Sequence, residues 1–219
     1  MDDFSSSGHA RPRDRAEAGT STLLGQVMFL VAVALCFMTA GAFIGQELSQ
    51  GTALICFLAG FGMLLAQAFG GERFRVGAFA IGWLYVVALL FGLGIGPTIA
   101  YFLENDGTVI TQAAGGTALI VLGMGAVGFT LSKDLASWMR PLTFIILGLV
   151  VVSFVLLIFS SGGNPIISAA IAIVSALLIM VDFNYLRKHG TENDAVWLAT
   201  GIFVSIVNIF LSLLNIFGD

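Results

Sequence analysis

The chain has 219 residues, of which 58% are hydrophobic and only 10% are charged. A soluble domain carries roughly 25% charged residues, so this composition excludes an ordinary soluble protein and indicates a chain that lies mostly in lipid. The formal net charge of −4 excludes the strongly basic surface on which nucleic-acid binding depends.

Residues 1–20, MDDFSSSGHARPRDRAEAGT, are polar and show no apolar periodicity, which predicts a disordered tail. Residues 21–219 form one domain of apolar runs that are separated by short polar or glycine-rich breaks. A membrane span needs about 20 apolar residues. The expected spans cover about residues 22–46, 51–69, 76–103, 109–131, 141–160, 165–186 and 193–217. The sequence therefore predicts an all-α, polytopic membrane protein with seven transmembrane helices.

Four residues mark the starts of the later spans. Pro141 and Pro165 suit the first turns of the fifth and sixth spans, because a proline lacks the N–H group that is unpaired there anyway. Thr191 and Asp194 have the spacing of a capping box just ahead of the seventh span.

The basic residues predict the orientation of the spans. They are Arg11, Arg13, Arg15, Arg73, Arg75, Lys133, Arg140, Arg187 and Lys188. With seven spans, they fall in the N-terminal tail and in the second, fourth and sixth breaks, which all face one side. The other breaks contain no lysine or arginine. The positive-inside rule then places the N-terminus in the cytoplasm and Asp219 outside.

Several intramembrane chemistries lack their residues in this chain. The only lysines are Lys133 and Lys188, and the only histidines are His9 and His189, all outside the expected spans. A retinal Schiff base needs a lysine inside a span, and a serine–histidine protease needs a histidine there. The sequence also contains no HExxH zinc motif and no phosphate-binding glycine loop. We therefore expect neither an enzyme nor a cofactor nor a metal centre.

Asp182 is the one ionisable residue that falls clearly inside an expected span. Such residues are costly in lipid and mark functional sites by default. Asp182 precedes Arg187 by five residues, which places it about 7 Å deeper along a helix. Two interpretations remain open: Asp182 lies on an ion path, or it reaches the interface and pairs with Arg187 or Lys188.

Four polar residues of the seventh span lie on one helical face. Ser205, Asn208, Ser212 and Asn215 are spaced by three, four and three residues. A polar stripe on an apolar helix faces other helices rather than lipid, which predicts a central seventh helix. The stripe can form interhelical hydrogen bonds or line a hydrated path for ions. Because an amide has more donors than a hydroxyl, we expect the loss of Asn208 to be more destabilising than that of Ser205.

Gly96 and Pro97 form a break in the third span, because proline removes one helical hydrogen bond. The pair predicts a kink, and the carbonyl that it frees is a candidate partner for Asn208 or for an ion. Most of the 27 glycines predict close packing between helices.

Three segments resemble the Bax inhibitor-one family, most closely its bacterial YccA-like branch. They are GLGIGPTIAYF (92–102), AGGTALIVLGMGAVGFTLSKDL (114–135) and HGTENDAVWLATGIFVSIVNIFLSLLNIFG (189–218). The resemblance extends over about residues 22–218. It implies six helices around a central seventh, a location in the inner membrane, and a modulator that binds the FtsH protease.

The resemblance also implies an alternative function. Other members of the family are pH-sensitive calcium leaks, in which one aspartate on the sixth helix and one on the seventh share a proton. Asp182 matches the first aspartate, whereas Ser205 stands at the position of the second. A calcium or proton leak would then depend on a single carboxylate, which cannot form a pair with a split titration. From Thr191, Ser205 lies about 21 Å along its helix, well below Asp182.

Overall fold

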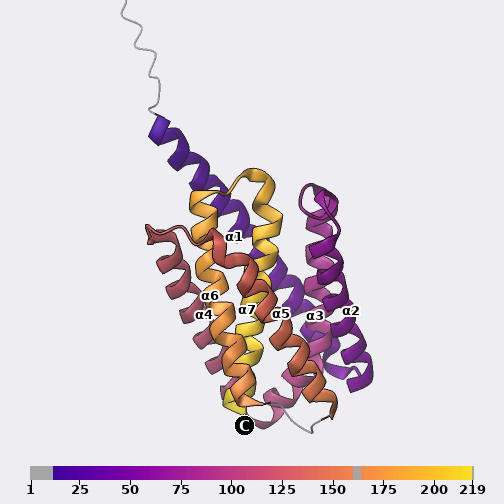
Figure 1. Cartoon of the computed structure of the whole chain (residues 1–219). Coiled ribbons are helices and arrows are strands. Elements are labelled where there is room, and N and C mark those ends of the chain that lie inside the picture. Colours follow the sequence, from indigo (N-terminus) through magenta and orange to yellow (C-terminus); the bar gives the residue numbers. More distant parts are fainter. Residues whose placement is uncertain (1–11, 160–163, 219) are drawn as a thin grey trace, which may run out of the picture.

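A computed structural model describes residues 12–159 and 164–218, and its helices follow one another with short connections (Figure 1). They are α1 (Pro12–Ile44), α2 (Gln50–Phe69), α3 (Ala78–Asn105), α4 (Gly107–Thr130), α5 (Ala136–Phe159), α6 (Pro165–Lys188) and α7 (Ala195–Gly218). All seven contain a segment that is long and apolar enough to cross a membrane, and the described residues contain no β-strand. The predicted all-α, seven-span membrane protein is confirmed.

The first helix begins earlier than the predicted boundary between tail and domain. α1 starts at Pro12, a residue type that suits a first helical turn. The expected tail of residues 1–20 therefore overlaps the first turns of α1. Residues 1–11 lie outside the described residues.

The start of α5 also differs from the expectation. The side chain of Asp134 accepts a hydrogen bond of 2.9 Å from the Ala136 N–H, and the helix begins at Ala136 rather than near residue 141. Pro141 consequently lies inside α5 and not in its first turn. Arg140, which the sequence placed in a loop, belongs to a membrane-spanning helix.

The sixth and seventh spans begin as predicted. α6 starts at Pro165, and the Asn164 side chain accepts a hydrogen bond of 3.0 Å from the Ile166 N–H. The capping box ahead of α7 is present: Asp194 accepts a hydrogen bond of 3.0 Å from the Thr191 N–H. These contacts satisfy N–H groups that a helix leaves unpaired at its start.

The seventh helix lies in the centre of the bundle (Figure 1). α7 packs against α1, α3, α4 and α6, and it is the most buried of the seven spans. α2 packs mainly on α3, and α5 mainly on α6. The predicted central position of the seventh helix is therefore confirmed.

α1 and α3 approach most closely where glycines of the two helices meet. A Cβ on Gly92 would overlap the backbone of α1, and a Cβ on Gly96 would lie 2.7 Å from the Cα of Gly45. Gly92 and Gly96 are four residues apart, as are Gly41 and Gly45, and this spacing of small residues brings helix backbones together in lipid. Gly96 thus serves close packing.

The proline break points in a different direction from the one expected. α3 continues through Pro97 to Asn105. The carbonyl that loses its hydrogen bond is that of Leu93, four residues earlier. Its oxygen lies 2.5 Å from the position that a Cβ on Gly45 would take, so it faces the turn Gly45–Glu47 at the end of α1. It does not face Asn208 on α7.

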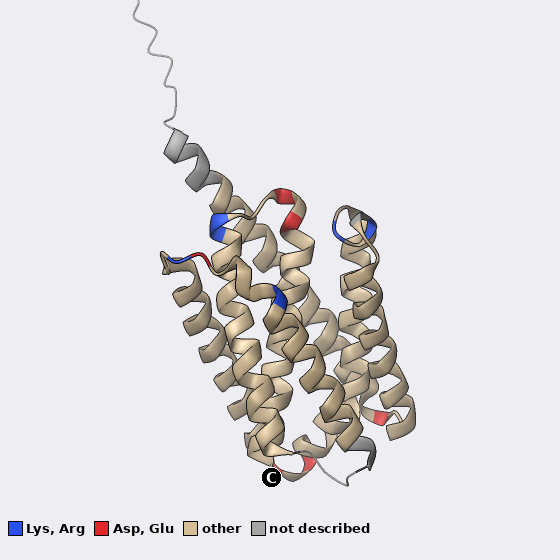
Figure 2. Ribbon diagram, in the orientation of Figure 1, with Lys and Arg blue, Asp and Glu red and all other residues tan. Residues whose placement is uncertain are grey.

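Charged side chains gather at the two ends of the bundle (Figure 2). The lysines and arginines of the described chain lie at or near one end, together with some acidic residues. The charged residues that the structure describes at the opposite end are acidic. This arrangement agrees with the segregation of basic residues that the seven spans require.

Two glycines of α3 provide a matched test of the α1–α3 contact. Gly92→Ala should destabilise the bundle by about 1–3 kcal/mol, because the added methyl group must push the α1 backbone away. Gly82→Ala on the same helix meets no atom within 4 Å and should leave the stability unchanged or raise it. Thermal unfolding in detergent measures both. Equal melting temperatures for the two variants would contradict the close approach.

Candidate functional site

A cavity of about 1630 Å³ lies between α7 on one side and α2 and α5 on the other. Parts of α3 and α6 complete its wall, and most of its lining side chains are apolar. α2 and α5 meet across it through Phe154, whose ring centre lies 5.5 Å from that of Phe57 and 5.8 Å from that of Phe61. A large apolar cavity with a few convergent polar groups is the default candidate for a binding site.

The polar seam, defined as Ser205, Asn208, Ser212 and Asn215 of α7, lines this cavity over roughly 15 Å of helix. Ser205 and Ser212 are buried, and the two asparagines are half-buried. Ser168 of α6 donates a hydrogen bond of 2.9 Å to the Asn215 side chain. The four residues thus face the interior of the bundle, as the spacing predicted.

Asp182 of α6 lines the same cavity and is only 6% exposed. Its Oδ2 atom lies 3.3 Å from the position that a Cβ on Gly201 would take. Arg187 and Lys188 turn away from it and donate to backbone carbonyls of the loop 131–135. Within the described residues, Asp182 forms no ion pair and no hydrogen bond, so the structure places it on the cavity wall.

Asp182 and Ser205 lie at different depths of the cavity. Asp182 is level with Gly201, which precedes Ser205 by four residues, or about 6 Å along α7. Asp182 is also the only carboxylate among the described lining residues. No three His, Cys, Asp or Glu side chains in the described ranges come together as a metal-binding group.

Asn208 lines the cavity together with Pro97 of α3. It forms no hydrogen bond with any residue that the structure describes, and the carbonyl freed by Pro97 faces the turn at the end of α1. The expected bond between Asn208 and the proline break is therefore not formed.

Gln67 of α2 is a cavity residue that the sequence analysis passed over. It is 8% exposed, and its Nε2 donates to the Thr200 hydroxyl on α7 at 3.1 Å and to the Phe74 carbonyl at 3.3 Å. Its Oε1 is buried without a hydrogen-bond partner. A glutamine inside an apolar run was the available signal, since polar side chains in lipid need a partner.

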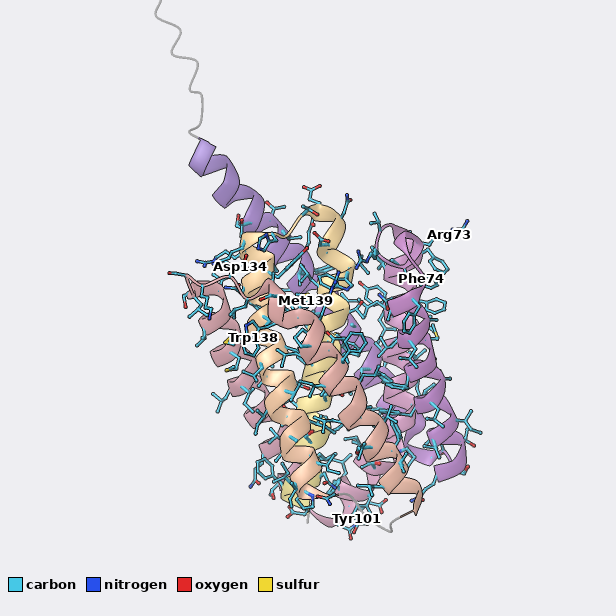
Figure 3. The ribbon with its side chains drawn as sticks, in the orientation of Figure 1. Arg73, Phe74, Tyr101, Asp134, Trp138 and Met139 are labelled. Atoms are coloured by element: carbon cyan, nitrogen blue, oxygen red, sulfur yellow. The ribbon has the colours of Figure 1, made fainter. Side chains whose placement is uncertain are left out.

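The basic mouth of the cavity, defined as Arg75 and Arg140, was also missed. The Arg75 guanidinium lies 5.5 Å from the ring centre of Trp197, which meets Tyr185 edge to face at 5.6 Å. Arg140 forms no ion pair or hydrogen bond within the described chain. Its place on α5 can be found from Met139, the residue before it, which Figure 3 labels. Both arginines line the cavity. Their positions depend on where α5 begins and how the α2–α3 connection folds.

Asn184 of α6 fixes the loop that precedes α5. Its side chain is fully buried, and its Nδ2 donates to the carbonyls of Gly128, Leu131 and Lys133 at 3.1–3.2 Å. Its Oδ1 accepts a hydrogen bond of 2.9 Å from the Leu135 N–H. One amide therefore holds the end of α4 and the start of α5 against α6.

A second contact holds the same loop outside the spans. His189 Nε2 lies 2.7 Å from Asp134 Oδ2. The hydrogen bond from the Ala136 N–H, and then that with His189, hold the pKa of Asp134 below its ordinary value. A carboxylate that stays ionised keeps both contacts in place.

The model of the family described as inhibitor of apoptosis-promoting Bax1 matches residues 20–219. Among individual proteins, a relative named modulator of FtsH protease YccA, from Escherichia coli K12, is 27% identical over 224 residues. That match covers 100% of this chain and 98% of the relative.

Two further relatives cover most of this chain. A membrane protein of Vibrio cholerae is 30% identical over 91% of this chain and 90% of its own length. A protein of Pseudomonas aeruginosa is 29% identical over 90% of this chain and 89% of its own length.

Two asparagines of neighbouring helices give a paired test of the hydrogen bonds. Asn184→Leu should destabilise the protein by about 2 kcal/mol, because it removes one accepted hydrogen bond and the two N–H donors that three carbonyls share, at about 0.6 kcal/mol for each of the three. Asn208→Leu should cost less, since Asn208 bonds to no described residue. Thermal melting of the two variants in one detergent measures the difference. A larger loss for Asn208→Leu than for Asn184→Leu would contradict this ranking by hydrogen bonds.

Proposed function

We propose, from the premise that this chain belongs to the family of inhibitors of apoptosis-promoting Bax1, that it regulates proteolysis in the bacterial inner membrane by binding an FtsH-type protease. The observation that carries the proposal is its similarity, over the full chain, to a protein named modulator of FtsH protease. The match covers all seven spans, so the likeness is to the whole bundle and not to one helix.

The location of most described residues in membrane-spanning helices supports a regulator that acts inside the membrane. The described residues lie almost wholly in seven membrane-spanning helices joined by short connections. The polar N-terminal residues ahead of the first span offer an ATP-driven protease a segment to grip. Binding would occur through the helices, and the tail would determine whether the regulator is itself degraded.

We propose that the basic end of the bundle and the N-terminus face the cytoplasm, with Asp219 outside. A reporter enzyme fused after Asp219 should then be active only outside the cytoplasm, and one fused before Met1 only inside. Activity of the C-terminal fusion in the cytoplasm would contradict this orientation.

Co-purification tests the proposal that this protein binds and regulates an FtsH-type protease. Tagged full-length protein, extracted in mild detergent, should recover the FtsH protease, and its overexpression should lengthen the half-life of an FtsH substrate. A variant without residues 2–11 should still recover the protease but should be degraded more slowly. An unrelated multi-span protein at equal abundance is the control. Failure to recover the protease, together with unchanged substrate turnover, would overturn the proposal.

A pH-sensitive leak for calcium or protons is the second candidate function. The observation that favours it is the position of Asp182 beside the polar seam on one cavity wall. A carboxylate attracts cations, and hydroxyl and amide groups can carry water along the seam. Ca²⁺ would meet a single carboxylate there, because the residue at the second position, about one turn further along α7, is Ser205 and not an aspartate.

Liposomes with an enclosed calcium dye test this candidate. The wild-type protein should admit Ca²⁺, and Asp182→Asn should reduce the flux to that of empty liposomes. Glu104→Gln is the matched control, because Glu104 is an exposed carboxylate of α3 that is not part of the cavity lining and should leave the flux unchanged. A wild-type flux that persists in Asp182→Asn would remove Asp182 as the site.

A further inference from the structure

We propose that the cavity binds an anionic phospholipid, with the phosphate at the basic mouth and the acyl chains along the apolar wall of α2 and α5. This proposal depends on neither the protease nor the leak. It rests on three features of the described chain: two arginines that line the cavity, an unpaired acceptor on Gln67, whose side chain bonds to the residue before Arg75, and an apolar wall between α2 and α5.

The first feature is the charge of the basic mouth. Arg140 belongs to a membrane-spanning helix, yet it forms no ion pair or hydrogen bond with the described residues. A charged side chain in a span normally pairs with another group or faces a polar space. Arg75 lines the same cavity, lies over the Trp197 ring and near Tyr185, and forms no hydrogen bond or ion pair with the described residues, which leaves its donors available to a ligand. Guanidinium groups bind phosphate oxygens in pairs, so an anion with phosphate chemistry fits this end.

The second feature is the unpaired oxygen of Gln67. Its Oε1 is buried and has no hydrogen-bond partner, although its Nε2 donates to Thr200 and Phe74. Gln67 is only 8% exposed, and it lines the cavity. A buried acceptor without a donor is rare in native proteins, and because this one lines the cavity, a hydroxyl group of a bound ligand can supply the donor. The hydroxyl groups of a phosphatidylglycerol headgroup are such donors.

The third feature is the apolar wall. From the basic mouth the cavity continues between α2 and α5 to the phenylalanines that meet at Phe154. Its volume of about 1630 Å³ exceeds the roughly 300–1,000 Å³ of pockets that hold small soluble ligands. Basic pockets between transmembrane helices bind anionic lipid headgroups. A phospholipid supplies both the phosphate and the long apolar part, whereas a free phosphate would fill only the mouth.

A transmembrane helix of a partner protein is the competing occupant. It would match the apolar wall, but it would bring no negative charge to two unpaired arginines at the mouth. Charge complementarity therefore favours the lipid.

Short-chain lipids with identical tails provide the test. Dioctanoyl phosphatidylglycerol and dioctanoyl phosphatidylcholine are titrated into the purified full-length protein in a neutral detergent, and native mass spectrometry counts the bound lipid. The protein should bind the anionic lipid at least tenfold more tightly. Arg75→Gln and Arg140→Gln should each weaken this binding by about fivefold, the equivalent of about 1 kcal/mol per basic residue.

Arg73→Gln is the matched control. Arg73 lies two residues from Arg75 with the same charge, but it is not part of the cavity lining. It should bind the anionic lipid as the wild type does. Unchanged melting temperatures without lipid establish that the variants remain folded.

Three results would overturn the proposal. Equal binding of the two lipids would show that charge has no role and would leave the cavity to a partner helix. Unchanged binding by both arginine variants would place the lipid elsewhere on the bundle. Full competition by glycerol phosphate at the same concentration would show that the site takes a soluble phosphate and not a lipid.

Discussion

The structure depends on the constraint that lipid offers no partner to polar groups and no hydrophobic force between helices. Polar side chains must therefore face protein or an enclosed polar space, and helices must hold together by contact. The polar seam satisfies the first demand by turning inward, which places α7 in the centre. Gly92 and Gly96 satisfy the second, because they let the α3 backbone touch α1.

Sequence reasoning succeeded where a single helix carries the signal. The length and apolarity of each run are enough to place a span, and the spacing of Ser205, Asn208, Ser212 and Asn215 is enough to orient α7. Asp182 was found because a carboxylate in an apolar run stands out. The N-terminal end of α1, from Pro12 onward, was missed because its residues are polar. Polar residues can extend a helix, but hydropathy does not reveal them.

The remaining features depend on contacts between helices, which no single run reveals. α5 begins at Ala136 because Asp134 caps it and Asn184 holds the preceding loop against α6, and this start brings Arg140 into the cavity wall. The direction of the carbonyl freed by Pro97 depends on the rotation of α3 about its axis, which close packing against Gly45 fixes. The hydrogen bond of Gln67 depends on the position of α2 opposite Thr200 of α7, which the α2 sequence does not reveal.

The cavity exists because two helices have few supports. α2 packs mainly on α3 and α5 mainly on α6, and neither lies directly against α7 over its length. Among the described residues, one side-chain hydrogen bond is formed between α2 and α7, from Gln67 to Thr200, and such bonds are worth only about 0.6 kcal/mol in membranes. The α1–α3 contact is far more extensive, so the bundle is packed closely on the side of α1 and α3 and less closely on the side of α2 and α5. A ligand or a partner that enters between α2 and α5 would have to displace Phe154 from Phe57 and Phe61, and it would then occupy the space that Asp182 and the polar seam line.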